Sequence, residues 1–392
     1  MKQLIIALLL LVTSTYTQEA NYWALTIQER AENMGLTYEQ YDVTTQDGYI
    51  LTLMRIYMDP LVDDRVLFMA HSFPDSAESF TYVDEGESPA FYLARQGFDI
   101  WLYNMRGNRY SRRHESLPVG AGYGVNRQYW EFHMDTIRFD YMACIQLILD
   151  TTGNSKIPVF GHSFGGETFL IALALEPDFF AQTVSLAILA GVPTVLRDTD
   201  YIPFILLGDY PQILNMMMLN GFNIFMNNNP IFSYFIHLNC AIFPLYCDGL
   251  NGFLVGEGHP FDLDEDGIEV FMSRTLDGIG IPLLQHLLQS LRTGDLTYFD
   301  YGPENNFEIY GSENPPEIPL ENINVPIALM WAEYDNIVTN NGVEWLTDQV
   351  SDNIIFEHTY QDYNHLSFII GNNMEPYLDD VIDLTESYPP EP

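Results

Sequence analysis

The sequence has very little positive charge. Among its 392 residues, only Lys2 and Lys156 are lysines, and 54 aspartates and glutamates outweigh 15 lysines and arginines, for a formal net charge of -39. This balance excludes nucleic acid as a partner and excludes electrostatic docking to anionic membranes. It fits a surface charged for solubility, a protein that works at acid pH where carboxylates take up protons, or a salty environment.

Cysteine is scarce as well, with three in the chain. Cys144 stands in a predicted helix and is expected to be a buried free thiol. Cys240 and Cys247 are close enough in sequence to close a small disulfide loop in an oxidising compartment. No His/Cys cluster has metal-site spacing, so neither a metal nor another cofactor is expected. The N-x-S/T acceptor of N-glycosylation is also absent.

Long apolar runs are missing except at the N-terminus. Lys2 is followed by an apolar stretch at residues 4–12, which is shorter than the roughly 20 residues of a membrane-spanning helix. The sequence therefore predicts a signal peptide over residues 1–17, cleaved near Thr17, and no transmembrane segment. The protein is expected in the secretory pathway, either secreted or delivered to a lysosome-like or phagosome-like compartment.

The apolar residues are arranged as strands alternating with helices, which predicts an α/β fold with a largely parallel sheet covered on both faces. The first two strands are predicted to form an antiparallel hairpin. Strands are expected at residues 38–43, 49–57, 66–70, 98–103, 157–160, 184–190, 325–331 and 354–360, and helices at 18–32, 90–96, 130–150 and 167–175.

The pattern changes between about residues 191 and 304, where proline, asparagine, methionine and aromatic residues dominate. This segment is predicted to be a mainly helical cap inserted between two parts of the core, residues 18–190 and 305–392. Its apolar side chains either form an ordinary core between helices or line a pocket or lid for an apolar substrate, because Met-rich surfaces adapt to varied partners.

The most informative motif is Gly161-His162-Ser163-Phe164-Gly165. It has the G-x-S-x-G pattern of a nucleophile elbow, in which a serine stands on a sharp turn between a strand and a helix. The motif follows an apolar run of strand type and precedes good helix formers, as such a turn requires. Ser163 is therefore the candidate nucleophile.

A serine nucleophile needs a histidine base and an acid that orients it, in the chain order serine, acid, histidine for this fold. His365 lies in a polar loop after the last predicted strand and is the candidate base. Asp335 directly follows the 325–331 strand and is the candidate acid, with Glu333 and Asp362 as rivals. The reaction also needs two backbone N–H groups facing the developing oxyanion, and these are expected from Phe164 and Phe73.

With these motifs, the chain resembles the acid lipase family of α/β-hydrolases, which includes gastric lipases and lysosomal acid lipase. The matching segments occur in the family's order from the first hairpin almost to the C-terminus. They are residues 47–51, 101–108, 111–114, 129–132, 161–165 and 363–368. Two positions depart from the family: Ser72 stands where a glycine usually follows the histidine of the oxyanion loop, and Phe164 stands where glutamine is common.

The resemblance implies an enzyme that hydrolyses triacylglycerol or cholesteryl esters at a lipid–water interface, with a cap over the active site. It places the family's nucleophile, acid and base at Ser163, Asp335 and His365, and its cap disulfide at Cys240 and Cys247. The alternative hypothesis is a lipid-binding member of the same fold with weak or no catalysis. Among enzymes, a peptidase of the same fold is also possible, but the Met- and Phe-rich insertion favours apolar acyl chains over peptides.

Overall fold

The computed structural model describes residues 25–61, 65–83, 87–120, 126–227 and 263–391, apart from the single residues 197, 200 and 276. The predicted signal peptide and the predicted Cys240–Cys247 disulfide lie outside these residues. Cys144 is buried and free, as expected.

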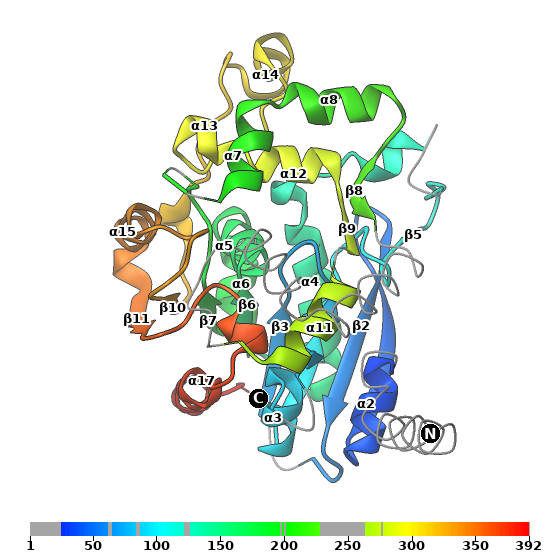
Figure 1. The fold of residues 1–392 in the computed structure, drawn as a ribbon, viewed down its shortest axis with the longest axis vertical. Helices are drawn as coiled ribbons and strands as arrows, with labels where there is room; N and C mark the ends of the chain where they lie inside the picture. The colour runs from blue at the N-terminus through cyan, green and yellow to red at the C-terminus, as the bar shows by residue number, and fades with distance from the viewer. Residues whose placement is uncertain are drawn as a thin grey trace, which may run out of the picture.

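A nine-stranded, mostly parallel sheet is the centre of the described fold (Figure 1). The first three strands in spatial order pair antiparallel, and the pairs from β4 onward are parallel. A short strand, β5 (Arg113–His114), pairs with β2 outside this path. The spatial order is β1 (Thr37–Thr44), β2 (Tyr49–Tyr57), β4 (Asp99–Leu102), β3 (Val66–Ala70), β6 (Ile157–His162), β7 (Val184–Ala190), β10 (Ile327–Ala332) and β11 (Ile354–Tyr360). The predicted α/β class and the predicted hairpin are confirmed.

One of the predicted helices begins later than expected. The helix predicted over residues 130–150 is replaced at its start by two 3-10 turns, η3 (Arg127–Trp130) and η4 (Met134–Thr136), and α4 runs only from Arg138 to Thr152. Trp130, Phe132 and Met134 are all buried, so this stretch packs apolar side chains on more than one side and does not follow a helical period. The helix predicted from residue 18 is described as α2 (Ile27–Asn33), capped by Thr26.

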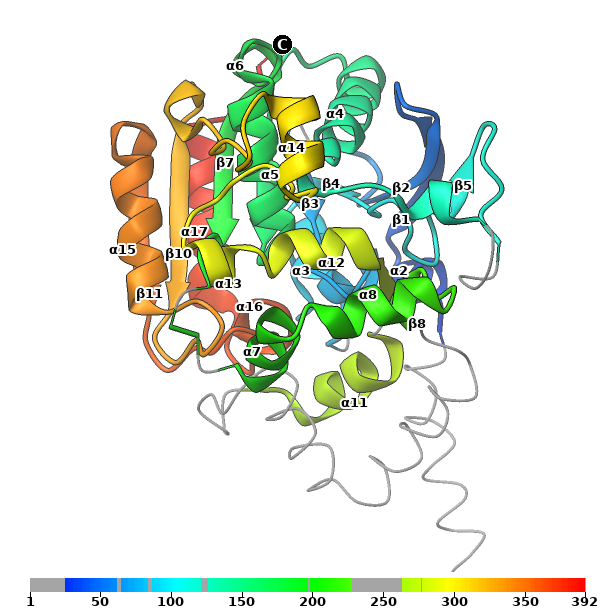
Figure 2. The ribbon, with the colours of Figure 1, turned by 90° about the horizontal axis from the view of Figure 1, so that it is seen from above.

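Both faces of the sheet are covered, because side chains alternate along each strand. In β7, Val184, Ala187 and Leu189 belong to one hydrophobic cluster, and Leu186 and Ile188 belong to the other. Figure 2 shows the helices that lie on either side of the strands. The first cluster includes residues of α4, α5 (Phe164–Leu175), α6 (Pro177–Thr183) and α15 (Asn340–Gln349), and the second includes residues of α2, α3 (Pro89–Arg95), α16 (Ser367–Ile370) and α17 (Glu375–Ser387).

The described part of the predicted insertion is mainly helical, as expected. Four of its helices, called the cap helices here, lie together at the top of the molecule in Figure 1. They are α7 (Ile202–Asp209), α8 (Gln212–Leu219), α12 (Ile281–Leu287) and α13 (Ser290–Thr293). A two-stranded antiparallel sheet of β8 (Ile224–Asn227) and β9 (Asp277–Gly280) and the helix α11 (Glu265–Arg274) complete this part.

Arginines cluster at residues 106–113, and three of them form ion pairs with aspartates. The buried Arg106 guanidinium contacts Asp47 and Asp140, at 2.6 and 2.5 Å respectively. Arg109 pairs with Asp277, and Arg113 pairs with Asp42. These contacts link the first hairpin, α4 and β9 to one loop.

The turn between β6 and α5 is possible only because of its glycines. A Cβ on Gly161 would lie 2.6 Å from the Cα of Gly166. A Cβ on Gly165 would lie 2.4 Å from the carbonyl oxygen of His71 and 2.5 Å from that of Ala70. Strand, helix and the loop after β3 therefore approach each other backbone to backbone, and a side chain at these positions would separate them.

We expect Gly165→Ala to destabilise the protein by about 3 kcal/mol or more, because the added methyl group meets two backbone oxygens that cannot rotate away. Gly311→Ala is the matched control, since nothing lies within 4 Å of its Cβ position and its φ of 74° is the only source of strain. That strain should cost only about 1–2 kcal/mol. Urea unfolding of both variants measures the difference, and equal costs would contradict the close approach.

The cap helices are joined to the core through two buried histidines. His133 lies just before η4 and stacks on Phe299, with ring centroids 3.8 Å apart. The Nδ1 atom of His286, on α12, accepts a hydrogen bond from the backbone N–H of Met134, and its Nε2 atom donates to the carbonyl of Thr297. Burial lowers the pKa of His133 to about 3, and it lowers the pKa of His286 as well.

The folded-state pKa of His133 lies below its ordinary value near 6.5, so below pH 6.5 the unfolded chain binds a proton at His133 and the folded chain does not. The contribution of His133 to the free energy of unfolding is therefore complete above pH 6.5 and declines as pH falls toward 3, by about 2 kcal/mol at pH 5. His133→Phe preserves an aromatic stack and should reduce the loss of stability between pH 7 and pH 5 by that amount. Urea unfolding at the two pH values tests this. In Tyr301→Phe, which alters the neighbouring hydroxyl but leaves His133 to titrate, the loss should persist.

Candidate active site

The three residues predicted as nucleophile, acid and base meet at the carboxyl ends of three parallel strands. Ser163 follows β6, Asp335 follows β10, and His365 follows β11. The Nε2 atom of His365 lies 2.8 Å from the Oγ of Ser163, and its Nδ1 atom lies 2.7 Å from the Oδ2 of Asp335. All three side chains are almost completely buried. The carboxyl ends of parallel strands are the usual place for ligand sites in such sheets.

Ser163 has a backbone conformation that non-glycine residues rarely adopt, with φ 55° and ψ -125°. Its N–H donates to the carbonyl of Ala190, at 2.7 Å, and its carbonyl accepts from Glu167 N–H in the first turn of α5. The turn therefore presents the hydroxyl at the end of the strand while neighbouring strand and helix hold the backbone. Such strain at a serine on this turn is the geometry of a nucleophile elbow.

The geometry places Asp335, and neither of its rivals, against the histidine. One oxygen of Asp335 contacts His365, and the other accepts the N–H groups of Ile337 and Val338, each at 2.8 Å. Glu333 accepts the N–H of Asp362, and both of these residues are exposed. The backbone N–H groups of Ile337 and Val338 thus hold the Asp335 carboxylate in its orientation toward His365.

The loop after β3 is oriented by His71. Its Nε2 atom accepts the N–H of Met105, at 3.1 Å, so its Nδ1 atom carries the proton and donates to the carbonyl of Ser72. Burial lowers the pKa of His71 to about 4, which keeps this tautomer neutral. In a trans peptide the carbonyl and the next N–H point in opposite directions. Holding the Ser72 carbonyl therefore directs the Phe73 N–H away from His71.

Phe73 and Phe164, the two predicted oxyanion donors, lie side by side. Their rings form an edge-to-face contact with centroids 5.3 Å apart, and Gly165 brings the start of α5 against the backbone of the same loop. Ser72 is not among the described non-glycine residues with a left-handed φ, which are Ser163, Asp198 and Asp362. The backbone at this position therefore needs no glycine, and the departure from the family pattern is accommodated.

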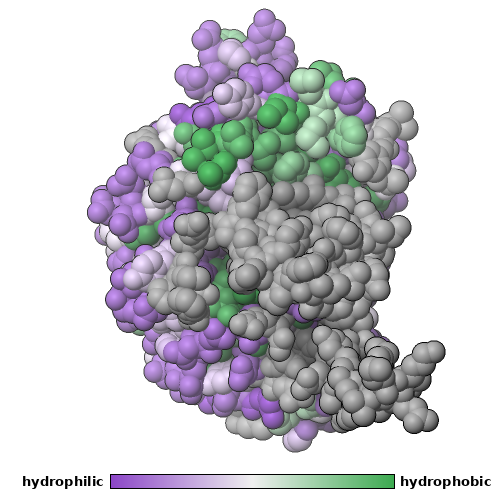
Figure 3. All heavy atoms as spheres, viewed as in Figure 1, coloured by the Kyte–Doolittle hydropathy of each residue, from purple (hydrophilic) through white to green (hydrophobic). Residues whose placement is uncertain are grey.

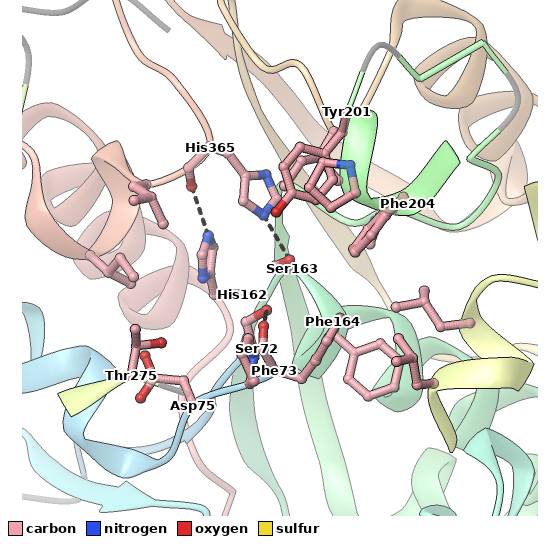
Figure 4. Close-up of a pocket in the computed structure, with 18 of the residues that line it drawn as sticks. Ser72, Phe73, Asp75, His162, Ser163, Phe164, Tyr201, Phe204, Thr275 and His365 are labelled. Carbon is pink, nitrogen blue, oxygen red and sulfur yellow. Dashed lines mark hydrogen bonds between the residues drawn. The ribbon is translucent and has the colours of Figure 1, made fainter. Parts of the chain in front are cut away.

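A pocket opens over Ser163 and is lined mostly by apolar side chains (Figure 4). They come from the loop after β3, from α5, from the cap helices and from the loops after β10 and β11. The described apolar residues are Phe73, Pro74, Phe164, Pro193, Tyr201, Pro203, Phe204, Leu207, Phe225, Phe271, Leu284, Leu287, Ile337, Leu366 and Ile369. The cap segment thus lines a pocket, one of the two roles that its composition leaves open.

Sequence reasoning assigned no role to three polar residues of this pocket, namely Asp75, His162 and Thr275. His162 occupies a position of the elbow motif at which any residue is allowed, so the motif gives it no role. Asp75 lies only two residues beyond Phe73, the predicted oxyanion donor. Burial raises the pKa of Asp75 to about 7 and lowers the pKa of His162 to about 3. Both groups are therefore uncharged at mildly acid pH. A sequence pattern cannot reveal this, because it depends on burial.

In the described part of the chain, the histidines, cysteines and carboxylates form no group of three or more that could hold a metal ion. No single described helix has the length and apolar character to cross a membrane. Taken together α7 and α8 would pass that test, but they are bent by 71° relative to each other.

Comparison with known proteins shows similarity to α/β-hydrolases and to lipases. Residues 65–226 match the model of the alpha/beta hydrolase fold, and residues 27–83 match that of the partial alpha/beta-hydrolase lipase region. The chain is 29% identical to Lipase member K of Homo sapiens, over 94% of this chain and 92% of that protein. It is 28% identical to Lipase lipl-3 of Caenorhabditis elegans, over 88% of each.

Further similarities agree with these matches. The chain is 26% identical to the tear acid lipase-like protein of Mesocricetus auratus, over 92% of this chain and 90% of that protein. A Sulfolobus solfataricus protein of known crystal structure superposes with a TM-score of 0.58 at 18% identity, covering 90% of this chain and 94% of that one, which supports the fold. The predicted resemblance to the acid lipase family of α/β-hydrolases is confirmed by these matches.

Proposed function

We propose that this protein is a serine lipase that hydrolyses triacylglycerol or cholesteryl esters through an acyl-enzyme. The observation that carries the proposal is the continuous hydrogen-bond chain from Asp335 through His365 to Ser163, at 2.7 and 2.8 Å, at the base of an apolar pocket. Similarity to lipases makes an ester the substrate class, and the apolar lining favours long acyl chains over peptides.

In this mechanism, Ser163 attacks the ester carbonyl carbon while His365 Nε2 takes the hydroxyl proton, and Asp335 orients the imidazole and stabilises its charged form. The N–H groups of Phe73 and Phe164 receive the oxyanion. His365 then protonates the departing alcohol, leaving the acyl group on Ser163. A water molecule, deprotonated by the same histidine, attacks the acyl-enzyme and releases the fatty acid.

The substrate is proposed to enter from a lipid–water interface across the cap helices. Ile202, Leu206, Ile213, Met216 and Leu219 are large apolar side chains of α7 and α8 that remain exposed, and we call them the cap apolar face. Figure 3 shows apolar side chains gathered over these helices. The other side of α7 contributes Phe204 and Leu207 to the pocket over Ser163, so one helix joins the exterior to the interior.

The remaining expectations complete the proposal. The N-terminal apolar stretch would direct the chain into the secretory pathway, where Cys240 and Cys247 would form a disulfide within the inserted cap. Residues 191–304 would act as the cap, and residues 18–190 and 305–392 as the hydrolase core. Sorting within the secretory pathway would then decide whether the protein is secreted or retained in a lysosome-like or phagosome-like compartment.

We expect Ser163→Ala to lower kcat/KM for a dissolved p-nitrophenyl butyrate by at least about a thousandfold, because the nucleophile is lost while the fold is kept. Asp335→Asn should lower it by a similar factor through the wrong imidazole tautomer. Ser312→Ala, an exposed serine after α14 (Pro303–Tyr310), is the matched control. Full activity of Ser163→Ala, or its labelling by a fluorophosphonate, would rule out Ser163 as the nucleophile. An unmodified protein that neither hydrolyses the ester nor reacts with the fluorophosphonate would instead be a lipid-binding protein.

The interface proposal predicts an effect that depends on the physical state of the substrate. Introducing aspartate at both Leu206 and Leu219 should lower the rate on emulsified triolein about tenfold or more, since two apolar anchors are lost. Hydrolysis of dissolved p-nitrophenyl butyrate should change less than twofold. Ile355→Asp, on the exposed part of β11, is the control for a new charge elsewhere. Equal losses on both substrates would show that the cap apolar face does not dock to lipid.

A further inference from the structure

The pocket over Ser163 has two ends that differ in polarity. Figure 4 shows Phe164 and Phe204 on one side of Ser163, and His162, Asp75 and Thr275 on the other. The side with Phe164 continues between apolar residues of α7 and α12. The opposite side mixes apolar walls with polar groups, so a wholly hydrocarbon ligand there would give the Nδ1 atom of His162 and the Oδ2 atom of Asp75 no hydrogen-bond partner.

His162 offers a hydrogen-bond acceptor on this side. Its Nε2 atom lies 3.0 Å from the carbonyl oxygen of His365, which can only accept, so Nε2 carries the proton. Because burial lowers its pKa to about 3, the ring is neutral and its Nδ1 atom keeps a free lone pair. Nδ1 is fully buried and has no hydrogen-bond partner in the structure as described. It needs a donor, and the protein supplies none among the residues placed here.

Asp75 offers the complementary donor. Its Oδ1 atom accepts two hydrogen bonds, from the Tyr82 hydroxyl at 2.5 Å and from the Ser76 N–H at 2.7 Å. Burial, together with the nearby Asp277 carboxylate, raises the pKa of Asp75 to about 7, so the group is protonated at mildly acid pH. With Oδ1 occupied by two donors, the proton belongs on Oδ2, for which the described residues provide no partner.

A lone-pair nitrogen and a carboxylic O–H lining one pocket match a hydroxyl group, which both donates and accepts. The position of the pair also fits the alcohol part of an ester. His162 precedes Ser163 in the chain and is hydrogen-bonded to the backbone of His365, whose ring passes a proton to the departing alcohol in the proposed mechanism. The apolar end beside Phe164 is then left for the acyl chain.

We propose that His162 and Asp75 bind a free hydroxyl on the alcohol part of the substrate, so that mono- and diacylglycerols are better substrates than esters lacking such a hydroxyl. This inference rests on the proposed ester hydrolysis at Ser163 and adds partial glycerides to its substrates, ranking them above triacylglycerols and cholesteryl esters. Triacylglycerols, cholesteryl esters and simple alkyl esters carry no free hydroxyl, so they form no hydrogen bond with His162 or Asp75 through one. For them, the polar end of the pocket must hold water or stay unpaired, which costs free energy.

The test compares 1-monooleoylglycerol with propyl oleate in the same mixed micelles at pH 5. The two esters share the acyl chain and a three-carbon alcohol, and they differ in the two hydroxyl groups. We expect the full-length protein to show kcat/KM about tenfold higher for 1-monooleoylglycerol. Asp75→Leu should reduce this ratio to near one, whereas Asp75→Asn, which retains a donor of nearly the same shape, should keep most of it.

Two controls separate selectivity from folding and from catalysis. Leu287→Ala, at the apolar end of the pocket, should lower kcat/KM for both esters by the same factor. Thermal unfolding shows whether Asp75→Leu is folded, and the Asp75→Asn ratio decides the matter if it is not. A tenfold ratio that survives Asp75→Leu in folded protein, a ratio lost in Asp75→Asn, or a wild-type ratio near one overturns the hydroxyl subsite while ester hydrolysis stands. Failure to cleave either ester overturns the proposed function itself.

Discussion

The active-site end of the molecule depends on backbone contacts that have no space for a methyl group. Gly161 lies against Gly166, and Gly165 lies against the carbonyl oxygens of Ala70 and His71. The first contact lets α5 leave β6 at a sharp angle, which places Ser163 in its strained conformation. The second brings the loop after β3 within reach of the same serine. The proposed nucleophile and the proposed oxyanion loop are thereby held by backbone contacts and do not rely on long side chains.

The protein has few positively charged side chains, and their positions determine its buried ion pairs. Most described arginines form ion pairs, and several pairs are buried. Glu78 shows the effect: although burial raises its pKa, Arg30 and Arg274 lower it to about 2. Its stabilising contribution is complete above about pH 4.5 and is lost only as pH falls through 2. The few positive charges therefore stabilise the interior against acid, while the remaining carboxylates form the surface.

Local sequence was sufficient where a structural element depends on its own residues. The strands β2, β3, β7 and β11 have the predicted bounds, because each is an apolar or alternating run between turn residues. The predicted helix over residues 130–150 was wrong at its start, because the burial of Trp130, Phe132 and Met134 is decided by packing against distant segments.

The same distinction applies to the site. Ser163, Asp335 and His365 could be selected by their order and their places after predicted strands, and the structure brings them together. The tautomer of His71 and the protonation of Asp75 could not be predicted, because they depend on burial and on partners far away in the sequence.

The acidic exterior has a consequence for the end of the proposed reaction. A neutral ester can approach a surface of net charge -39 without electrostatic penalty, but its hydrolysis yields a fatty acid that ionises on reaching water. The negative potential around the protein then repels this anion and disfavours its return to the pocket. Because most described arginines form ion pairs with carboxylates, few positive charges remain to attract the product anion, and the surface would favour the approach of uncharged lipid over the return of the charged product.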